Sequence, residues 1–177
     1  MSKKLIGQKK LEKGITQIFS KAVGEYISMG LDADFWYDCV TEEVHFSIIM
    51  SERGDRCFKE FFHKQYGINL KTSVELFIMS VLHEIGHYYT YDDVTDDIFN
   101  YCKDEEERIQ AELEINDTDE IYSRYFYLPD EIVANDWAAA WYKDHPKKFK
   151  KLIDKVQLLL NDFYTQNVDI DTYNGCE

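Results

Sequence analysis

The sequence predicts an α+β fold, mostly helical, in which a single domain carries a small sheet packed beside a buried helix. Segments near both ends of the chain repeat apolar residues every three or four positions, as amphipathic helices do. Two short segments between residues 34 and 50 are rich in aromatic and β-branched residues, which favours strands. With 177 residues, 45% of them hydrophobic, the chain is long and apolar enough to bury one core.

The first elements are one helix and two strands. Residues 11–29 place apolar side chains on one side of a helix, which Gly30 is expected to end. Residues 34–39 and 44–50 have the composition of strands, and the polar residues 41–43 between them predict a tight turn. The sequence therefore predicts a hairpin after the N-terminal helix.

Two helices follow, and glycine and threonine mark their ends. Gly54 is expected to close a loop, after which residues 57–66 form a short helix that ends at Gly67. The next helix begins at Thr72 with a capping box, in which the Thr hydroxyl and a Glu three residues later satisfy free backbone amides. The rest of this helix is apolar almost all round, so it belongs inside the protein.

The C-terminal half contains an acidic segment with helical stretches and then two more helices. Pro129 predicts the start of a helix that runs to about Lys143. The last helix is expected from Pro146 to about Tyr164, with one apolar side turned to the core. Residues 121–128 are ambiguous between strand and helix.

No linker, repeat or low-complexity segment divides the chain, so residues 1–165 are expected to form one domain, followed by a loosely held C-terminal tail over residues 166–177. No apolar run approaches the length of a membrane span, and the N-terminal residues lack the apolar core of a signal peptide. The four cysteines are scattered without a CxxC pair. These features predict a cytoplasmic protein with reduced cysteines and no membrane partner.

The most specific chemical feature is His83-Glu84-Ile85-Gly86-His87, which matches the HExxH motif of zinc sites. Residues four apart lie on one face of a helix, so both imidazoles can reach one zinc ion, and the glutamate can act as general base. The alternative is a pair of core histidines, hydrogen-bonded to backbone or carboxylates. A glycine inside a helix costs about 1 kcal/mol relative to alanine, so Gly86 indicates the close approach of another element.

A second helix offers a third ligand. Glu131 and Asn135 are four residues apart and share one face of the predicted helix with Ala138. A catalytic zinc site needs three protein ligands and one open position, and two histidines with one glutamate are an established set. Asn135 is placed to orient a ligand through a hydrogen bond. The alternative is an ordinary amphipathic helix with a solvated Glu and Asn.

The sequences HEIGH at residues 83–87 and ExxANxWA at residues 131–138 resemble the gluzincin type of zinc peptidase, in particular the ImmA/IrrE-like family of phage and bacterial metallopeptidases. The resemblance covers residues 72–141. It implies a zincin-like metallopeptidase domain in which a small sheet packs beside the HExxH active-site helix. The implied zinc ligands are His83, His87 and Glu131, with Glu84 as general base and acid and Asn135 beside them. It also implies that the predicted strand over residues 44–50 binds extended peptide substrate by strand addition.

The charge of the chain is uneven. Residues 92–120 hold thirteen acids and two basic residues, which accounts for most of the net charge of −14. This acidic block is interpreted as a solvated helical face, as an acidic wall that favours basic peptides near the cleft, or as a surface that imitates nucleic acid. A charge this negative argues against direct nucleic-acid binding, because phosphate contacts need a basic patch.

These features predict a zinc-dependent metallopeptidase with Zn²⁺ as cofactor and a peptide or protein as substrate, and the resemblance suggests a regulatory protease of phage or mobile-element origin. The alternative is a non-catalytic zinc-binding protein of the same fold, which acts as an acidic binding or inhibitory module. The presence of Glu84 favours the enzyme, since a protein without turnover does not need it. A donor to the developing oxyanion is also expected, and the candidates are Tyr88, Tyr89, His45, His63 and several later tyrosines.

Overall fold

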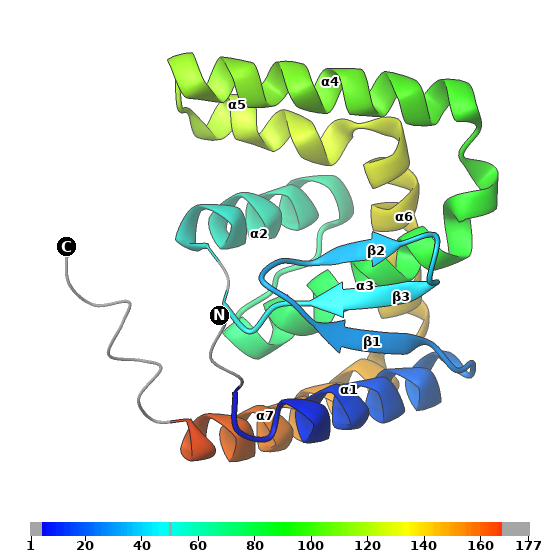
Figure 1. Cartoon of the computed structure of the whole chain (residues 1–177), viewed down its shortest axis with the longest axis vertical. Helices are drawn as coiled ribbons and strands as arrows, with labels where there is room; N and C mark the ends of the chain where they lie inside the picture. Colours follow the sequence, from blue (N-terminus) through cyan, green and yellow to red (C-terminus); the bar gives the residue numbers. More distant parts are fainter. Residues whose placement is uncertain (1–4, 50, 168–177) are drawn as a thin grey trace.

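A three-stranded sheet lies in front of a buried helix in the computed structural model, which describes residues 5–49 and 51–167 (Figure 1). The pair α1 and α7 lies at one end of the molecule, and α4 and α5 lie at the other. The sheet and α3 lie between these two pairs. The elements in chain order are α1 (Gln8–Val23), β1 (Ser28–Leu31), β2 (Trp36–Asp38), β3 (Glu43–Phe46), α2 (Glu52–Tyr66), α3 (Ser73–Thr90), η1 (Tyr91–Asp93), α4 (Asp96–Ile115), α5 (Asp119–Ser123), η2 (Arg124–Tyr127), α6 (Pro129–Asp144) and α7 (Pro146–Gln166).

The sheet has the strand order β1-β3-β2, with β3 parallel to β1 and antiparallel to β2. Its buried residues include Met29, Val44 and Phe46, and the Phe46 ring meets Phe77 of α3 edge to face, with ring centroids 5.9 Å apart. The sheet therefore packs against α3. The predicted α+β, mostly helical fold is confirmed.

The N-terminal helix ends earlier than the sequence predicted. Gly24, with a φ of 96°, caps α1, and Gly30 lies in β1. The Ser20 hydroxyl then accepts a hydrogen bond of 3.0 Å from the Ile27 amide, which holds the chain as it turns back. The prediction of helix up to residue 29 was wrong, because β1 gains its hydrogen bonds from β3, a partner that helical periodicity does not reveal.

The role predicted for the second strand was also wrong. That strand, β3, is shorter than residues 44–50, and residue 50 lies outside the described residues. Since β1 and β2 flank β3 on both sides, β3 has no free edge for an added strand. β2, which follows residues 33–35, is instead one of the two edge strands of the sheet.

The helices before the HExxH motif begin and end through local hydrogen bonds. Ser51 caps α2 by accepting from the Gly54 amide at 2.9 Å, so Gly54 lies in the first turn of the helix and the predicted loop there was wrong. Gly67, with a φ of 70°, ends α2 as predicted. The capping box at Thr72 is confirmed, because its hydroxyl accepts from the Glu75 amide at 3.1 Å while the Glu75 carboxylate accepts from the Thr72 amide at 2.9 Å.

The C-terminal helices follow the predicted positions closely. α6 begins at Pro129, and α7 extends to Gln166, two residues beyond its predicted end. Of the ambiguous residues 121–128, residues 121–127 are helical, within α5 and η2, and Leu128 is the N-cap of α6. Asn167 exchanges hydrogen bonds with the backbone of Ile6, which ties the start of the predicted tail to the domain. The remaining tail residues, 168–177, lie outside the described residues.

Within the described ranges, no helix is both long enough and apolar enough to cross a membrane. Cys39, Cys57 and Cys102 are free thiols in the structure, and Cys176 lies outside the part it describes.

Helices α3 and α6 touch at Gly86. A Cβ atom added to Gly86 would lie 2.9 Å from the Cα atom of Ala134 and would also clash with the Ala134 carbonyl oxygen. The obstacle is helix backbone, which cannot turn aside as a flexible side chain can. The close approach that Gly86 predicted is therefore confirmed, and the approaching element is the helix that carries Glu131.

Replacing Gly86 with alanine is expected to lower the free energy of unfolding by about 2 kcal/mol in urea titrations, since an overpacking cost of about 3 kcal/mol outweighs a helix-propensity gain of about 1 kcal/mol. The matched control is Gly14→Ala in α1, where the added Cβ would meet only the tip of the Leu159 side chain. That tip can rotate away, so the control should change stability by less than about 1 kcal/mol. Equal stabilities of the two variants would contradict a rigid contact between α3 and α6.

Candidate metal site

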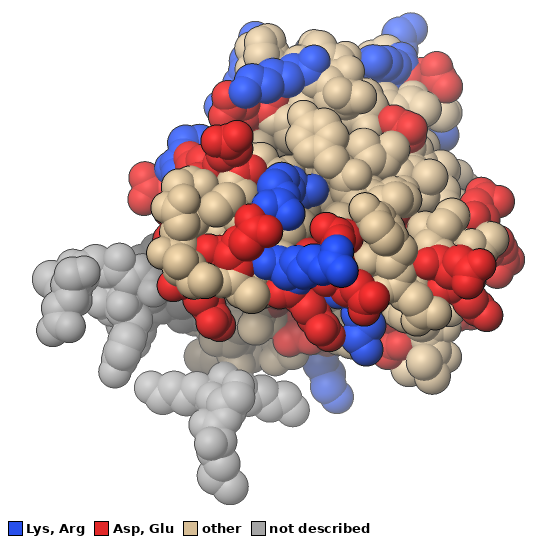
Figure 2. All heavy atoms as spheres, turned by 90° about the horizontal axis from the view of Figure 1, so that it is seen from above, with Lys and Arg blue, Asp and Glu red and all other residues tan. Residues whose placement is uncertain are grey.

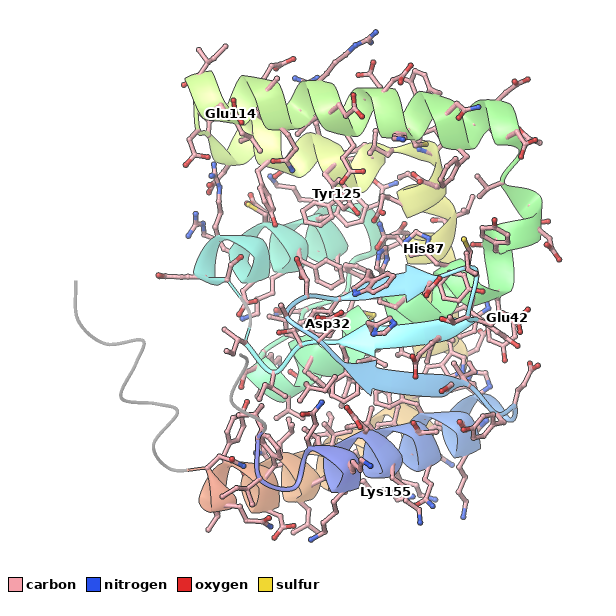
Figure 3. All side chains as sticks on the ribbon, in the orientation of Figure 1. Asp32, Glu42, His87, Glu114, Tyr125 and Lys155 are labelled. Carbon is pink, nitrogen blue, oxygen red and sulfur yellow. The ribbon has the colours of Figure 1, made fainter. Side chains whose placement is uncertain are left out.

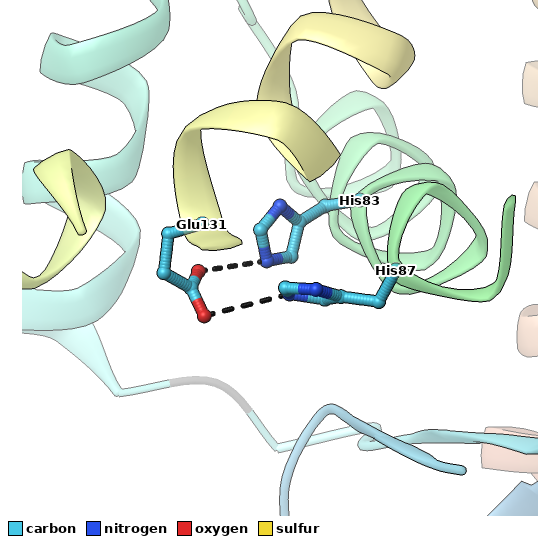
Figure 4. A group of neighbouring side chains, drawn as sticks. All are labelled: His83, His87 and Glu131. Atoms are coloured by element: carbon cyan, nitrogen blue, oxygen red, sulfur yellow. Dashed lines mark ion pairs between the residues drawn. The ribbon is translucent and has the colours of Figure 1, made fainter. Parts of the chain in front are cut away.

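Three predicted ligands converge where α3 meets α6 (Figure 4). His83 Nε2 lies 3.1 Å from Glu131 Oε2, and His87 Nε2 lies 3.4 Å from Glu131 Oε1. One ligand atom from each residue lies within 4.8 Å of the other two. Atoms that bind zinc tetrahedrally at about 2.0–2.1 Å stand about 3.4 Å from one another. The donor types and their separations therefore fit a zinc ion.

Local sequence and helix packing produce this convergence together. The spacing of four residues places His83 and His87 on one face of α3, one turn apart. Pro129 begins α6, so Glu131 lies in its first turn. Gly86 and Ala134, which form the close contact, lie next to these ligands on the two helices. The glycine thus allows the two ligand-bearing faces to come within reach of one ion.

The site is buried and its charges are strongly coupled. The side chains of His83 and Glu131 are 8% and 6% exposed. Burial alone would raise the pKa of Glu131, but the two imidazoles outweigh that effect and lower it. Burial opposes the charged form of His87, yet the Glu131 carboxylate raises the pKa of His87 to about 9. Glu131 is therefore an ionised carboxylate, as a metal ligand must be.

Glu84 lies beside this cluster without belonging to it. Its side chain is 7% exposed, and its nearest basic atom is His83 Nε2 at 3.9 Å. Burial raises the pKa of Glu84, and the neighbouring histidines oppose that shift. Glu84 forms no hydrogen bond with the part of the chain that the structure describes, and it lines a cavity. A carboxylate in this position can accept a proton and release it again.

Asn135 lies one turn after Glu131, as predicted, and is completely buried. Both polar atoms of its amide lack a hydrogen-bond partner among the described residues, and so does His83 Nδ1. Unpaired buried amides are rare because they lose their hydrogen bonds to water. Among the described residues, the Asn135 side chain forms no hydrogen bond to a candidate metal ligand. Its predicted role in orienting a ligand therefore stays a prediction.

Tyr125 of η2 is a neighbour of the site that the sequence did not single out. Burial raises the pKa of its hydroxyl well above the ordinary range, and the charge of Glu131 and hydrogen bonding to that carboxylate add to the shift. In the view of Figure 3, Tyr125 and His87 are both labelled between β2 and α4. The sequence signal was only a tyrosine a few residues before Pro129, among thirteen tyrosines in the chain.

The other candidate donors lie elsewhere. Tyr88 and Tyr89 donate hydrogen bonds to Glu25, at 3.2 and 3.0 Å. His45 stacks on Trp36 in the sheet, with ring centroids 4.1 Å apart. None of these side chains, nor that of His63, lines the cavity beside Glu84.

That cavity, of about 510 Å³, lies next to the three ligands. Its walls come from α2, α3, α4, η2 and the segment of residues 33–35 before β2. His83, Glu84, Glu131 and Tyr125 all line it. A molecule in this cavity would contact the candidate metal ligands and the buried carboxylate together.

Most of the acidic block lies outside this cavity. Of the acids in residues 92–120, only Glu106 lines it. Several others form ion pairs, including Asp119 with Arg56 at 2.8 Å and Glu112 with Arg124. Figure 2, seen from the α4 end, shows acidic side chains interspersed with basic and uncharged ones. This face is a mixed, solvated surface, without the continuous negative charge of a nucleic-acid mimic.

Comparisons of the chain with protein-family models, curated proteins and solved structures find no match. The resemblance to gluzincins therefore stays a prediction that rests on residues 83–87 and 131–138. What the site does has to be inferred from its own residues.

Proposed function

We propose that the protein is a zinc-dependent metallopeptidase of the gluzincin type, with a zincin-like fold related to the ImmA/IrrE-like family. The observation that carries this proposal is the convergence of His83, His87 and Glu131 beside the buried carboxylate of Glu84. Two histidines and one glutamate leave a fourth position open, as catalytic zinc sites require. The position of the sheet over the HExxH helix also supports a zincin-like arrangement.

A zinc ion bound by the three ligands supplies Lewis-acid activation of water and of the peptide carbonyl. Glu84 takes the proton of the attacking water and passes it to the leaving amine. Its burial raises its pKa toward the working pH, which suits both transfers.

The free edge of β2 offers a place for the backbone of the substrate. β2 is an edge strand, and residues 33–35, which lead into it, line the cavity. An extended peptide that adds to this edge forms main-chain hydrogen bonds without any demand on sequence. We propose β2 for this role in place of β3.

Metal analysis and peptide cleavage test the proposal directly. Purified protein should contain about one zinc ion per chain, in line with a site of three protein ligands. It should cleave unstructured peptides, lose this activity to a chelator and regain it when zinc is added. Protein that neither contains zinc nor takes it up would rule the proposal out.

Replacing Tyr125 with phenylalanine is expected to weaken zinc binding about 10- to 100-fold, because we propose that its hydroxyl, which lines the same cavity as Glu131, orients that carboxylate. Competition with a zinc-selective dye measures this affinity. The matched control is Tyr122→Phe, since Tyr122 also lines the cavity but has no contact with the ligands. If both variants bind zinc as tightly as the wild type, Tyr125 does not position Glu131.

A further inference from the structure

Acidic side chains line the cavity from its mouth to the candidate metal site. Asp34 and Glu106 are exposed at the entrance, and Asp55 is half-buried in the wall formed by α2. Glu84 and Glu131 lie at the buried end. Among the described residues that line the cavity, none is a lysine or an arginine. Glu131 is paired with His83 and His87, so the acids that give the lining a negative potential without a basic partner in it are Asp34, Asp55 and Glu106.

Among these acids, Asp55 has a buried carboxylate oxygen without a hydrogen bond to the described residues. Its Oδ1 atom is fully buried and has no hydrogen-bond partner among the described residues. A buried carboxylate oxygen without a donor is unfavourable, because water no longer solvates it. Burial raises the pKa of Asp55 more than Lys59, one turn later on α2, lowers it, and Lys59 forms no ion pair with Asp55 within 4 Å. Asp55 thus lines the cavity as a carboxylate that is not fully paired within the described residues.

The two arginines of α2 near Asp55 form ion pairs with other acids. Arg56 Nη2 lies 2.8 Å from Asp119 Oδ2, and Arg53 pairs with Asp117 and with Asp119 at 3.1 Å. Neither arginine lines the cavity. The negative charge of the cavity is therefore available to a ligand.

Apolar side chains complete the lining around Asp55. Phe58, one turn after Asp55, meets His83 edge to face, with ring centroids 6.1 Å apart. Phe126 packs against Phe58, and the buried Ile109 lines the cavity as well. A ligand next to the histidines thus meets apolar surface and carboxylate in the same cavity. Lysine and arginine combine these properties, with an apolar stem and a charged head.

The buried end of the cavity carries a carboxylate without a hydrogen bond to the described residues. The Glu84 side chain is more than nine-tenths buried, lines the cavity and has no hydrogen bond within the described residues. A group of this kind is retained where it acts on a bound molecule.

We propose that the cavity receives a lysine or arginine side chain of the peptide substrate, close to the bond that is cut, and that Asp55 binds its charged head. Asp34 and Glu106 attract the cation at the entrance, whereas Asp55 meets it inside. This inference rests on the proposed peptidase function, because it names the substrate of the same site.

Peptide binding to zinc-loaded Glu84→Gln protein tests the preference without any need for turnover. Fluorescent peptides that differ at one position are compared by anisotropy, with arginine, lysine, norleucine or glutamate at that position. The basic peptides should bind at least about 10-fold more tightly than the norleucine peptide, and the glutamate peptide should bind most weakly, as expected for a charge-assisted contact of about 1.4 kcal/mol or more. Adding Asp55→Asn should reduce the advantage of the basic peptides to less than about 3-fold.

The matched control is Glu114→Gln, which removes an exposed acid of α4 outside the cavity and should keep the full preference. Equal binding of basic and norleucine peptides overturns the inference, and so does a preference that survives Asp55→Asn. The comparison of basic and norleucine peptides needs only the Glu84→Gln protein. It therefore still tests the preference for basic peptides if the Asp55 variant does not fold. Wild-type protein that cleaves all peptides equally would refute the basic preference but keep the peptidase. Protein that cleaves none, yet binds basic peptides through Asp55, would refute the peptidase alone.

Discussion

Replacing Glu84 with glutamine should abolish peptide cleavage while zinc binding and folding persist. Glutamine has nearly the same shape but cannot take the proton of the attacking water, so kcat should fall by about 10³-fold. The carboxylate does not belong to the three converging ligands, so zinc content should stay at the wild-type level. Cleavage of a fluorogenic peptide, together with metal analysis of the same sample, measures both effects.

The stability of this variant separates a catalytic role from a structural one. Burial raises the pKa of Glu84, which means that the site disfavours its negative charge. A neutral amide of the same size removes that penalty, so the melting temperature should be equal or higher. A variant that still cleaves at the wild-type rate would show that Glu84 is not the general base. A loss of activity that coincides with unfolding would instead assign Glu84 a structural role.

Replacing Glu131 with alanine should release the metal. The carboxylate lies within 3.1 and 3.4 Å of the two imidazoles and supplies the only acidic ligand of the three. Loss of an outer hydrogen-bond partner already lowers metal affinity about 10- to 100-fold, so loss of a ligand should lower it by more than about 100-fold. Titration with a chelating dye measures the change. The matched control is Glu114→Ala, an exposed acid at the far end of α4 (Figure 3).

Proton release provides a second measurement of the same variant. Glu131 raises the pKa of His87 to about 9, so His87 is protonated at pH 8 in the metal-free protein. Zinc binds the neutral imidazole, and its uptake at pH 8 should therefore release this proton. Without Glu131 the pKa of His87 should fall to the ordinary value of about 6.5 or below, because burial is then no longer outweighed, and zinc uptake should release one proton fewer per ion bound. Calorimetry in two buffers with different ionisation enthalpies detects it. Unchanged proton release in Glu131→Ala would contradict the pairing of Glu131 with His87.

The helices of the candidate site could be predicted because their signals are local. The capping box at Thr72, the proline at residue 129 and the spacing of His83 and His87 each act within a few residues. Gly86 even predicted that another element would approach, because its lack of a side chain is costly inside a helix. That the element is α6, with Ala134 at the contact, is visible only in the folded chain.

The predictions that were wrong concern contacts between separate segments. Residues 28–31 carry no strong strand signal, and they are ordered as β1 through pairing with β3. This pairing makes β3 the central strand and leaves β2 at the edge beside the cavity. Asp55 could not be identified for the same reason, since its burial depends on how α2 packs, and not on its neighbours in sequence.

The sequence by itself determined the types of ligand and the helices that carry them, because helix spacing and capping depend on neighbouring residues. Only the tertiary structure decided that Glu131 meets both histidines and that Tyr125 adjoins Glu131. It also decided that an acidic cavity opens beside Glu84. These arrangements join α2, α3, α4, η2 and α6, and side chains of distant segments meet only when burial of the core packs their helices together.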